Sequence, residues 1–180
     1  MTAARWLRLA NTAAGWEGRY SVARRIEAQF DREVVRLCVA TFELAASPVR
    51  LSVPGWAESL DARIVATQDP ADPHHEELDL DRIKTWSDSR GERFLDVTAP
   101  RDGDRFDPLG MGGDTQALND FFRGRGVSKH DRRRSLVVRD RVGIVWVVGH
   151  RIAHRVRVTE ETRRRLFLHH SGGCSPEPRE

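Results

Sequence analysis

Residues 136–148 read LVVRDRVGIVWVV, two short apolar runs rich in branched residues on either side of a polar segment. Such runs are typical of strands, and the polar segment at residues 139–143, which ends in a glycine, suits a tight turn. The stretch therefore predicts an antiparallel hairpin. A chain built around it needs a sheet to cover the apolar side chains of both strands.

Further strands are expected upstream of this hairpin. The stretches VRLSVPG (residues 49–55) and DARIVATQ (61–68) alternate between apolar and polar residues, and residues 93–100 read as a strand that ends at Pro100. The stretch DPADPHHEELD (69–79), with two prolines and clustered acids, predicts a loop. Between residues 19 and 44, apolar runs flank a polar break at 31–33; this favours a hairpin, with a helix through Val22, Ile26 and Phe30 as the alternative.

Two short helices are expected in the middle of the chain. Asp114 is a good N-cap, and from Thr115 the apolar positions fall on one helical face until Gly124 and Gly126 end the helix. Ser128 can cap a second helix, SKHDRRRS, whose exposed face is almost wholly basic. We expect a strand in HRIAHRVRV (150–158), and a last turn or strand after Thr159.

This order of elements predicts an α+β fold of small β-sheets with short helices packed against them. The periodicities also predict a single buried cluster. Its expected members are Phe106, Leu109, Leu118, Phe121, Val137, Ile144, Trp146 and Val148.

Charge is distributed unevenly along the chain. Residues 1–100 carry 13 Lys and Arg against 16 Asp and Glu, whereas residues 120–165 carry 14 against 5, a net charge of +9. A basic lobe beside a neutral-to-acidic lobe is the pattern expected of a polyanion binder. An Arg-rich composition with a solvated surface is the alternative reading, since the chain has only two lysines.

Other sequence features limit the location and the chemistry. No apolar run approaches eighteen residues, we recognise no signal peptide, and Cys38 and Cys174 offer neither a disulfide framework nor zinc spacing. We therefore expect a cytoplasmic protein with no membrane partner. The glycine-rich GMGGD lacks the lysine of a phosphate loop and suits a turn.

No group of residues in the sequence predicts catalysis or metal binding. The histidines read as solvated side chains: His150 and His154 lie in a strand-like stretch, where the helical spacing of a zinc motif does not apply. The acids Asp102, Asp104 and Asp107 could bind a cation, but acids in such turns more often cap the backbone. We predict neither catalytic nor metal-binding residues, and no cofactor for this chain.

Residues 100–168 resemble the C-terminal domain of tRNA(Ile)-lysidine synthases, a PheT/TilS-like C-terminal domain. The family opens with a motif R-x-G-D-R-F-x-P-L-G, followed by a short helix, a basic helix, a hairpin with W-V-x-G, and a closing T-x-x-T. The opening is matched by Arg101, Gly103, Asp104, Arg105, Phe106, Pro108, Leu109 and Gly110, and the close by Trp146, Gly149, Arg151, Ile152, Thr159 and Thr162.

The resemblance implies a role in tRNA modification. The family's enzymes use ATP with magnesium to adenylate the wobble cytidine of a minor isoleucine tRNA, and lysine then displaces the adenylate. An N-terminal PP-loop domain does this chemistry, and the C-terminal region grips the tRNA. The SGGxDS motif of the PP-loop is absent from these 180 residues; HHSGGCSPE (169–177) lacks its Asp, and prolines follow. The chain alone is therefore expected to bind tRNA without catalysing the ligation.

The resemblance also divides the chain and points to RNA contacts. We expect a linker or hairpin region over residues 1–50, the domain itself over 51–168, and a disordered tail over 169–180. The GDRF turn is expected to be architectural, with Phe106 and Leu109 as its anchors and Arg105 able to pair with an acid. The RNA-binding candidates are the basic helix and one face of the strand after the hairpin: Lys129, Arg132, Arg133, Arg134, Arg151, Arg155 and Arg157.

The sequence is also compatible with two other interpretations. The chain could be an interaction module that docks a separate PP-loop catalytic chain through its acidic lobe, without an RNA role. It could also be a decayed fragment. Salt dependence separates the first alternative from RNA binding, because contacts with phosphates weaken steeply with salt.

Overall fold

The computed structural model divides the chain into two compact units, residues 1–44 and 45–180. It describes the backbone of 18–23, 26–31 and 34–39, and residues 47–60, 62–69 and 74–172. In the first unit, strands β1 (Gly18–Ala23), β2 (Ile26–Asp31) and β3 (Val34–Val39) form an antiparallel sheet in chain order. The hairpin expected around the polar break is confirmed, since Asp31 pairs with Val34.

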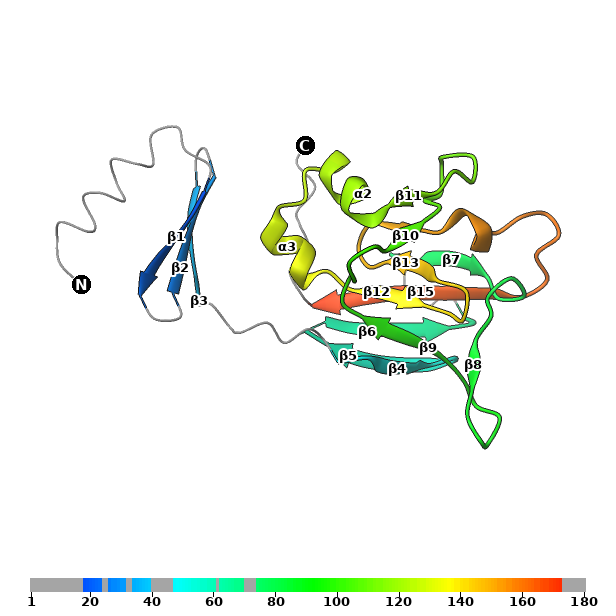
Figure 1. Cartoon of the computed structure of the whole chain (residues 1–180). Coiled ribbons are helices and arrows are strands. Elements are labelled where there is room, and N and C mark those ends of the chain that lie inside the picture. The colour runs from blue at the N-terminus through cyan, green and yellow to red at the C-terminus, as the bar shows by residue number, and fades with distance from the viewer. Residues whose placement is uncertain are drawn as a thin grey trace. The chain divides into compact units, whose positions relative to one another are not determined.

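The second unit holds two larger sheets (Figure 1). Their order, with all neighbours antiparallel, is β14-β13-β12-β9-β4 with β8 on the side of β9, and β5-β6-β15-β7. The six-stranded sheet consists of β4 (Val49–Ser52), β8 (Trp86–Ser87), β9 (Arg93–Thr98), β12 (Val137–Arg139), β13 (Ile144–Val147) and β14 (Arg151–Ile152). The four-stranded sheet consists of β5 (Gly55–Ser59), β6 (Ala62–Thr67), β7 (Glu76–Asp79) and β15 (Arg165–Gly172).

Two short helices come after strand β9 in the chain. A two-residue ladder of β10 (Arg105–Phe106) with β11 (Gln116–Ala117) leads into α2 (Leu118–Gly124), which is followed by α3 (Lys129–Arg134). A 3-10 turn, η1 (His154–Val156), comes after β14. The α+β expectation of small sheets with short helices is therefore confirmed.

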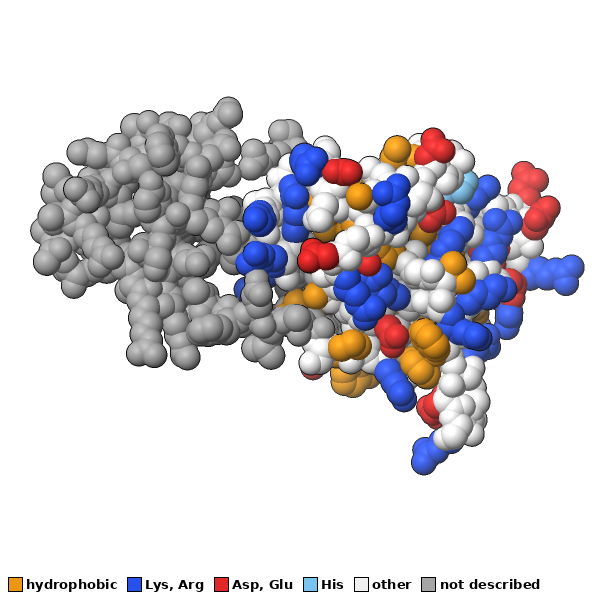
Figure 2. Space-filling view, in the orientation of Figure 1, with side chains coloured by type: hydrophobic (Ala, Val, Ile, Leu, Met, Phe, Trp, Pro, Cys, Tyr) orange, Lys and Arg blue, Asp and Glu red, His pale blue; other side chains and the backbone are white. Residues whose placement is uncertain are grey.

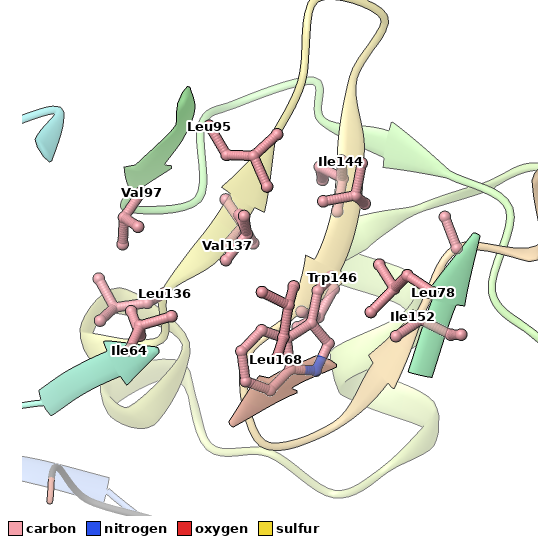
Figure 3. Packing of buried hydrophobic residues seen from close by; sticks show 14 of the residues in the cluster. Ile64, Leu78, Leu95, Val97, Leu136, Val137, Ile144, Trp146, Ile152 and Leu168 are labelled. Atoms are coloured by element: carbon pink, nitrogen blue, oxygen red, sulfur yellow. The ribbon is translucent and has the colours of Figure 1, made fainter. Parts of the chain in front are cut away.

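One hydrophobic core joins the two sheets and α2 (Figure 3). Ile64 and Leu168 reach it from the four-stranded sheet, and Val97 and Trp146 from the six-stranded sheet, each at most 2% exposed. Phe122 of α2 is fully buried in the same cluster. Of the eight residues expected in the core, six are buried and two, Leu109 and Val148, are half-buried and packed against it, so the predicted cluster is confirmed.

The hairpin of residues 136–148 also forms as predicted. Val138 lies opposite Trp146, and Arg139 lies opposite Ile144 across the turn. Every residue of β13 is buried, so both faces of this strand are covered.

The predicted start of the first helix is wrong. The helix begins at Leu118 rather than Thr115, and Asp114 does not cap it: the N-cap is Ala117, without a side-chain hydrogen bond. Residues 116 and 117 instead pair with Arg105 and Phe106, so their backbone groups are used in a ladder. The expected end, at Gly124 with Gly126 just beyond it, is confirmed.

Two further expectations need correction. The stretch expected to be a loop at 69–79 ends in strand β7, because β15 pairs with it and Leu78 is buried opposite Leu166. Residues 150–158 do not form one strand: β14 ends at Ile152, and η1 follows. A strand would need further ladder partners, whereas Ala153 already bridges to Pro108.

The domain limits inferred from the sequence differ from the observed strands at both ends. Strand β4 begins at Val49 and so crosses the expected boundary between residues 50 and 51. Strand β15 continues through His169 and His170 to Gly172, where it pairs with Ala62 of β6. The tail expected from residue 169 therefore overlaps this strand, and residues 173–180 lie outside the described part of the chain.

Candidate nucleic-acid interface

Helix α3 is short, basic and capped as predicted. The Ser128 hydroxyl accepts a hydrogen bond from the Asp131 N–H at 3.2 Å, which satisfies one of the free donors at the helix start. Arg132 folds back, so that its Nε donates to the Val127 carbonyl at 2.9 Å. Lys129, Arg133 and Arg134 are exposed and provide the cationic surface of this helix.

A second cation lies just after α2. Arg125 is exposed, and its guanidinium carbon stands 4.6 Å from the centre of the Phe121 ring. Gly126 follows with a φ of +67°, a conformation that favours glycine. The chain can therefore turn sharply into Val127, whose N–H donates to the Phe122 carbonyl at 3.0 Å. Phe121 is itself buried, so Arg125 rests on the apolar base of the helix.

The turn between β13 and β14 brings a third cation to the same region. The Val148 N–H donates to the Leu136 carbonyl at 3.0 Å, which holds this turn against the segment that leaves α3. Arg151 follows; its Nε is buried and makes no hydrogen bond within the described part of the chain. Burial and, second to it, the charge of Arg151 lower the pKa of Arg125, so the two guanidinium groups are close enough to repel each other.

These side chains form what we call the basic corner: Arg125, Lys129, Arg133, Arg134 and Arg151. Figure 2 shows blue side chains gathered over α3 and the nearby end of α2. Like charges held together in this way cost folding free energy unless an anion joins them. The corner can therefore attract phosphates.

Two histidines beneath the basic corner are packed rather than solvated, contrary to the sequence-based expectation. His150 meets the rings of Phe121 and Phe122 at 6.2 and 5.7 Å between centroids, and His170 meets Trp146 at 5.8 Å. Burial, Arg125 and His170 lower the pKa of His150 to about 4. Burial and then His169 lower the pKa of His170. Neutral His150 therefore adds no charge to the corner at neutral pH.

Arg155 occupies a different place from the one predicted. It lies on η1, so the expected strand face shared by Arg151, Arg155 and Arg157 does not exist. Its guanidinium donates to both carboxylate oxygens of Asp140, at 2.9 and 2.8 Å, and the Asp140 side chain is fully buried. Arg155 therefore holds the hairpin turn in place.

Arg157 is also engaged within the domain. Its Nη1 donates to the His154 carbonyl at 3.0 Å, and its backbone bridges to Leu78 of β7. Among the seven residues predicted to bind RNA, Arg132, Arg155 and Arg157 therefore make contacts that stabilise the fold. Lys129, Arg133, Arg134 and Arg151 belong to the basic corner.

The GDRF turn forms a structural junction. Gly103 has a φ of +83°, and the Asp104 carboxylate binds the Arg139 guanidinium and accepts from the Arg101 N–H at 2.7 Å. Phe106 packs edge-on against Phe121 at 5.0 Å between centroids. The Arg105 Nη2 donates to the Thr115 carbonyl at 3.2 Å, and among the described residues no acid pairs with Arg105.

The rest of the motif fastens the turn to the six-stranded sheet. Pro108 bridges to Ala153, and the Leu109 N–H donates to the Ile152 carbonyl at 2.9 Å. Gly110, with a φ of +101°, continues the turn in a conformation suited to glycine. Trp146, at the centre of the core, is 2% exposed. These residues therefore fix the position of α2, and of Arg125 just after it, on the six-stranded sheet.

Acidic side chains in this region satisfy the backbone or lie near arginine. Burial raises the pKa of Glu76, and the charge of nearby Arg151 partly opposes this rise. The Asp107 carboxylate accepts from the Arg155 N–H at 2.8 Å. Within residues 47–60, 62–69 and 74–172, no group of three or more His, Cys, Asp or Glu side chains could hold a metal ion. No helix in the described ranges is both long enough and apolar enough to cross a membrane.

The acidic and basic lobes read from the sequence are not separate bodies. The division between the compact units falls at residue 44, so acidic residues 49–98 fold with the basic segment after residue 100. Arg125 was missed as a candidate because sequence reasoning followed the basic helix. Its place between two glycines, in the stretch RGRG, is a local signal that it follows a helix end.

Comparison with known proteins agrees with this architecture. A crystal structure described as the TILS C-terminal domain matches with a TM-score of 0.55 at 22% identity, over 72% of this chain and 100% of the other. A tRNA(Ile)-lysidine synthase of Caldanaerobacter subterraneus subsp. tengcongensis is 36% identical over 94 residues, 52% of the chain and 18% of that protein.

The same synthase from two further organisms gives similar matches. That of Parabacteroides distasonis is 29% identical over 126 residues, and that of Dehalococcoides mccartyi is 31% identical over 118. These alignments cover 69% and 65% of this chain. Over the matched part, the chain has the fold of that crystal structure, and its sequence is similar to part of each of these synthases. No family model matches the chain.

The match concerns only part of each lysidine synthase. The chain spans 18% to 25% of the length of these curated relatives. The opening GDRFDPLG and the hairpin with Trp146, on which the sequence-based resemblance rested, lie at the junction and in the core of this domain. This chain and the crystal structure described as the TILS C-terminal domain therefore share a fold.

Proposed function

We propose that this chain is the C-terminal part of a lysidine synthase and that it binds tRNA through the basic corner. The observation that carries the proposal is that Arg125 and Arg151 are close enough to repel each other, beside a turn that the Val148–Leu136 hydrogen bond holds against the segment leaving α3. The names of the matched relatives include tRNA(Ile), and we therefore propose tRNA as the polyanion that the basic corner binds.

The contacts would be made to the RNA backbone. The major groove of an A-form helix is too narrow for side chains to read, so arginines outside it meet phosphates and 2′-hydroxyls. Such contacts fix position and recognise shape rather than sequence. Lys129, Arg133 and Arg134 stand on one short helix, and Arg151 lies near the turn that follows β13, so the corner suits neighbouring phosphates of one strand.

In this proposal the ligation is done elsewhere. ATP with magnesium and lysine would be bound by a PP-loop domain, on the same polypeptide or on a separate chain, and the present domain would position the minor isoleucine tRNA for it. The site of action would be the cytoplasm. The isolated chain is accordingly expected to bind tRNA and to form no lysidine.

The test is a titration of tRNA at several salt concentrations. If four to six phosphates are neutralised, log K should fall with log salt with a slope of roughly −3 to −5. Replacing Arg133 and Arg134 by Ala should flatten that slope by about one to two units. All tRNAs should be weakened alike, since phosphates carry no sequence information.

A matched control for the Arg133 and Arg134 variant lies at the start of β15. Arg164 and Arg165 are also consecutive and exposed, and they pair with Asp81 and Glu77. Replacing both by Ala removes two positive charges, as replacing Arg133 and Arg134 does. This variant should keep the original slope. Absence of tRNA binding at low salt, or an equal effect of the two variants, would contradict the proposal.

A further inference from the structure

The outer face of the six-stranded sheet carries aromatic side chains as well as cations. In β9, Leu95 and Val97 are fully buried in the core, so Phe94 and Asp96 point to the opposite face. Trp86 of β8 lies directly opposite Phe94 in the ladder and is 39% exposed. Two neighbouring strands thus place two aromatic rings on one face.

Each of these rings has an arginine beside it. The Arg50 guanidinium carbon lies 4.6 Å from the centre of the Phe94 ring, and that of Arg141 lies 5.8 Å from the Trp86 ring. Arg50 belongs to β4 on one side of β9, whereas Arg141 belongs to the hairpin turn. We call Arg50, Trp86, Phe94 and Arg141 the stacking face.

The geometry of the hairpin turn keeps Arg141 beside Trp86. The Arg141 N–H donates to the Lys84 carbonyl at 3.0 Å, and the Lys84 N–H donates to the Asp140 carboxylate at 2.9 Å. Val142, in the same turn, is 66% exposed. Figure 2 shows hydrophobic side chains among blue ones over β4 and β9.

The charge of the surface selects the class of occupant. Arg50, Arg141 and the exposed Lys84 bring three positive charges. Asp140, the acid in the turn, is already bound to Arg155, and Asp96 is half-buried opposite Arg50. The Asp88 carboxylate, two residues after Trp86, accepts hydrogen bonds from the N–H groups of Arg90 and Glu92. A ligand for this surface should therefore be an anion with flat apolar groups.

We propose that the stacking face binds an unpaired nucleotide of RNA. Unpaired bases stack on aromatic rings and on guanidinium planes, and their phosphates pair with arginine, whereas a duplex hides its base faces. The inference rests on the proposed tRNA binding, to which it adds contacts that require a single-stranded part of the RNA. An acidic peptide is the rival occupant.

The experiment compares two fluorescein-labelled RNAs by anisotropy with the full chain. One is a single-stranded oligonucleotide of eight nucleotides. The other is a blunt-ended hairpin whose loop leaves no base free to stack. Trp86→Leu should weaken the single strand about 5- to 100-fold, and leave the hairpin within about twofold. Trp86→Phe, which keeps a ring, should retain most of the affinity.

Trp56→Leu is the matched control. Trp56 is 54% exposed and stacks with Arg63 at 4.3 Å, but it lies on β5 of the four-stranded sheet. Its variant should bind both RNAs as the original chain does. Thermal unfolding of each variant shows that the comparison concerns folded protein.

The outcomes separate this inference from the proposal on which it rests. If the hairpin and tRNA bind but Trp86→Leu does not weaken the single strand, or weakens it only as much as Trp56→Leu, the stacking face is refuted and tRNA binding stands. If no RNA binds at low salt, both fail. An acidic peptide of eight glutamates is tested in the same way. If it binds more tightly than the RNA and its binding depends on Trp86, the nucleotide proposal is refuted and an acidic peptide is the occupant.

Discussion

Replacing Arg155 by Ala should destabilise the domain strongly, although this residue was first predicted to bind RNA. The buried Asp140 carboxylate accepts hydrogen bonds from Arg155 and from the N–H groups of Lys84, Val142 and Gly143, at 2.8 to 3.0 Å. Burial alone would raise the pKa of Asp140, but these donors together hold the pKa below its usual value. The carboxylate is therefore charged at neutral pH, and Arg155 is its counter-ion.

The expected loss follows from this geometry. Removing one partner of a buried ion pair costs about 3–5 kcal/mol, because the other charge stays buried without compensation. The Arg155 side chain is 25% exposed, and three N–H donors still reach Asp140 in the variant, so we expect about 3 kcal/mol. Domains of this size are stable by roughly 5–15 kcal/mol, so the loss is a large fraction of the total.

Urea denaturation followed by tryptophan fluorescence measures this loss. Arg133→Ala, an exposed arginine of α3, is the control and should change the free energy of unfolding by less than about 0.5 kcal/mol. The folded Arg155→Ala protein should keep the salt slope of tRNA binding. A loss below about 1 kcal/mol with an unchanged m value would refute the structural role assigned to Arg155.

Three further predictions concern His150, Ser128 and Phe122. The free energy of unfolding should fall as pH falls from about 6.5 to about 4, because the unfolded imidazole binds a proton that folded His150, with a pKa of about 4, does not; His150→Phe should remove this part of the pH dependence in urea titrations. Ser128→Ala removes the N-cap of α3 and should cost about 1 kcal/mol, measured by thermal unfolding. Phe122→Ala opens a cavity at a fully buried site and should cost about 3–5 kcal/mol; a loss under about 1 kcal/mol would contradict the assigned core.

Local signals in the sequence were sufficient for several elements. The hairpin of residues 136–148 was predictable because both strands and the turn are contiguous, although the shift in register between Val138 and Arg139 was not predicted. The cap at Ser128 and the helix end at Gly124 were predictable for the same reason, since each depends on neighbours within a few residues. The order of strand, turn and helix around the GDRF segment also followed from local chemistry in its glycines and proline.

Tertiary structure decided the elements whose partners are distant in the chain. Glu76–Asp79 reads as loop by composition, yet it is a strand because β15, almost ninety residues later, supplies its ladder. The start of α2 depends on pairing with β10, which removes residues 116 and 117 from the helix. Arg155 has the same charge as Arg133, but a buried carboxylate fifteen residues away makes it structural. Local propensity carries no information on such partners, because they meet only when the two sheets and α2 close around one core.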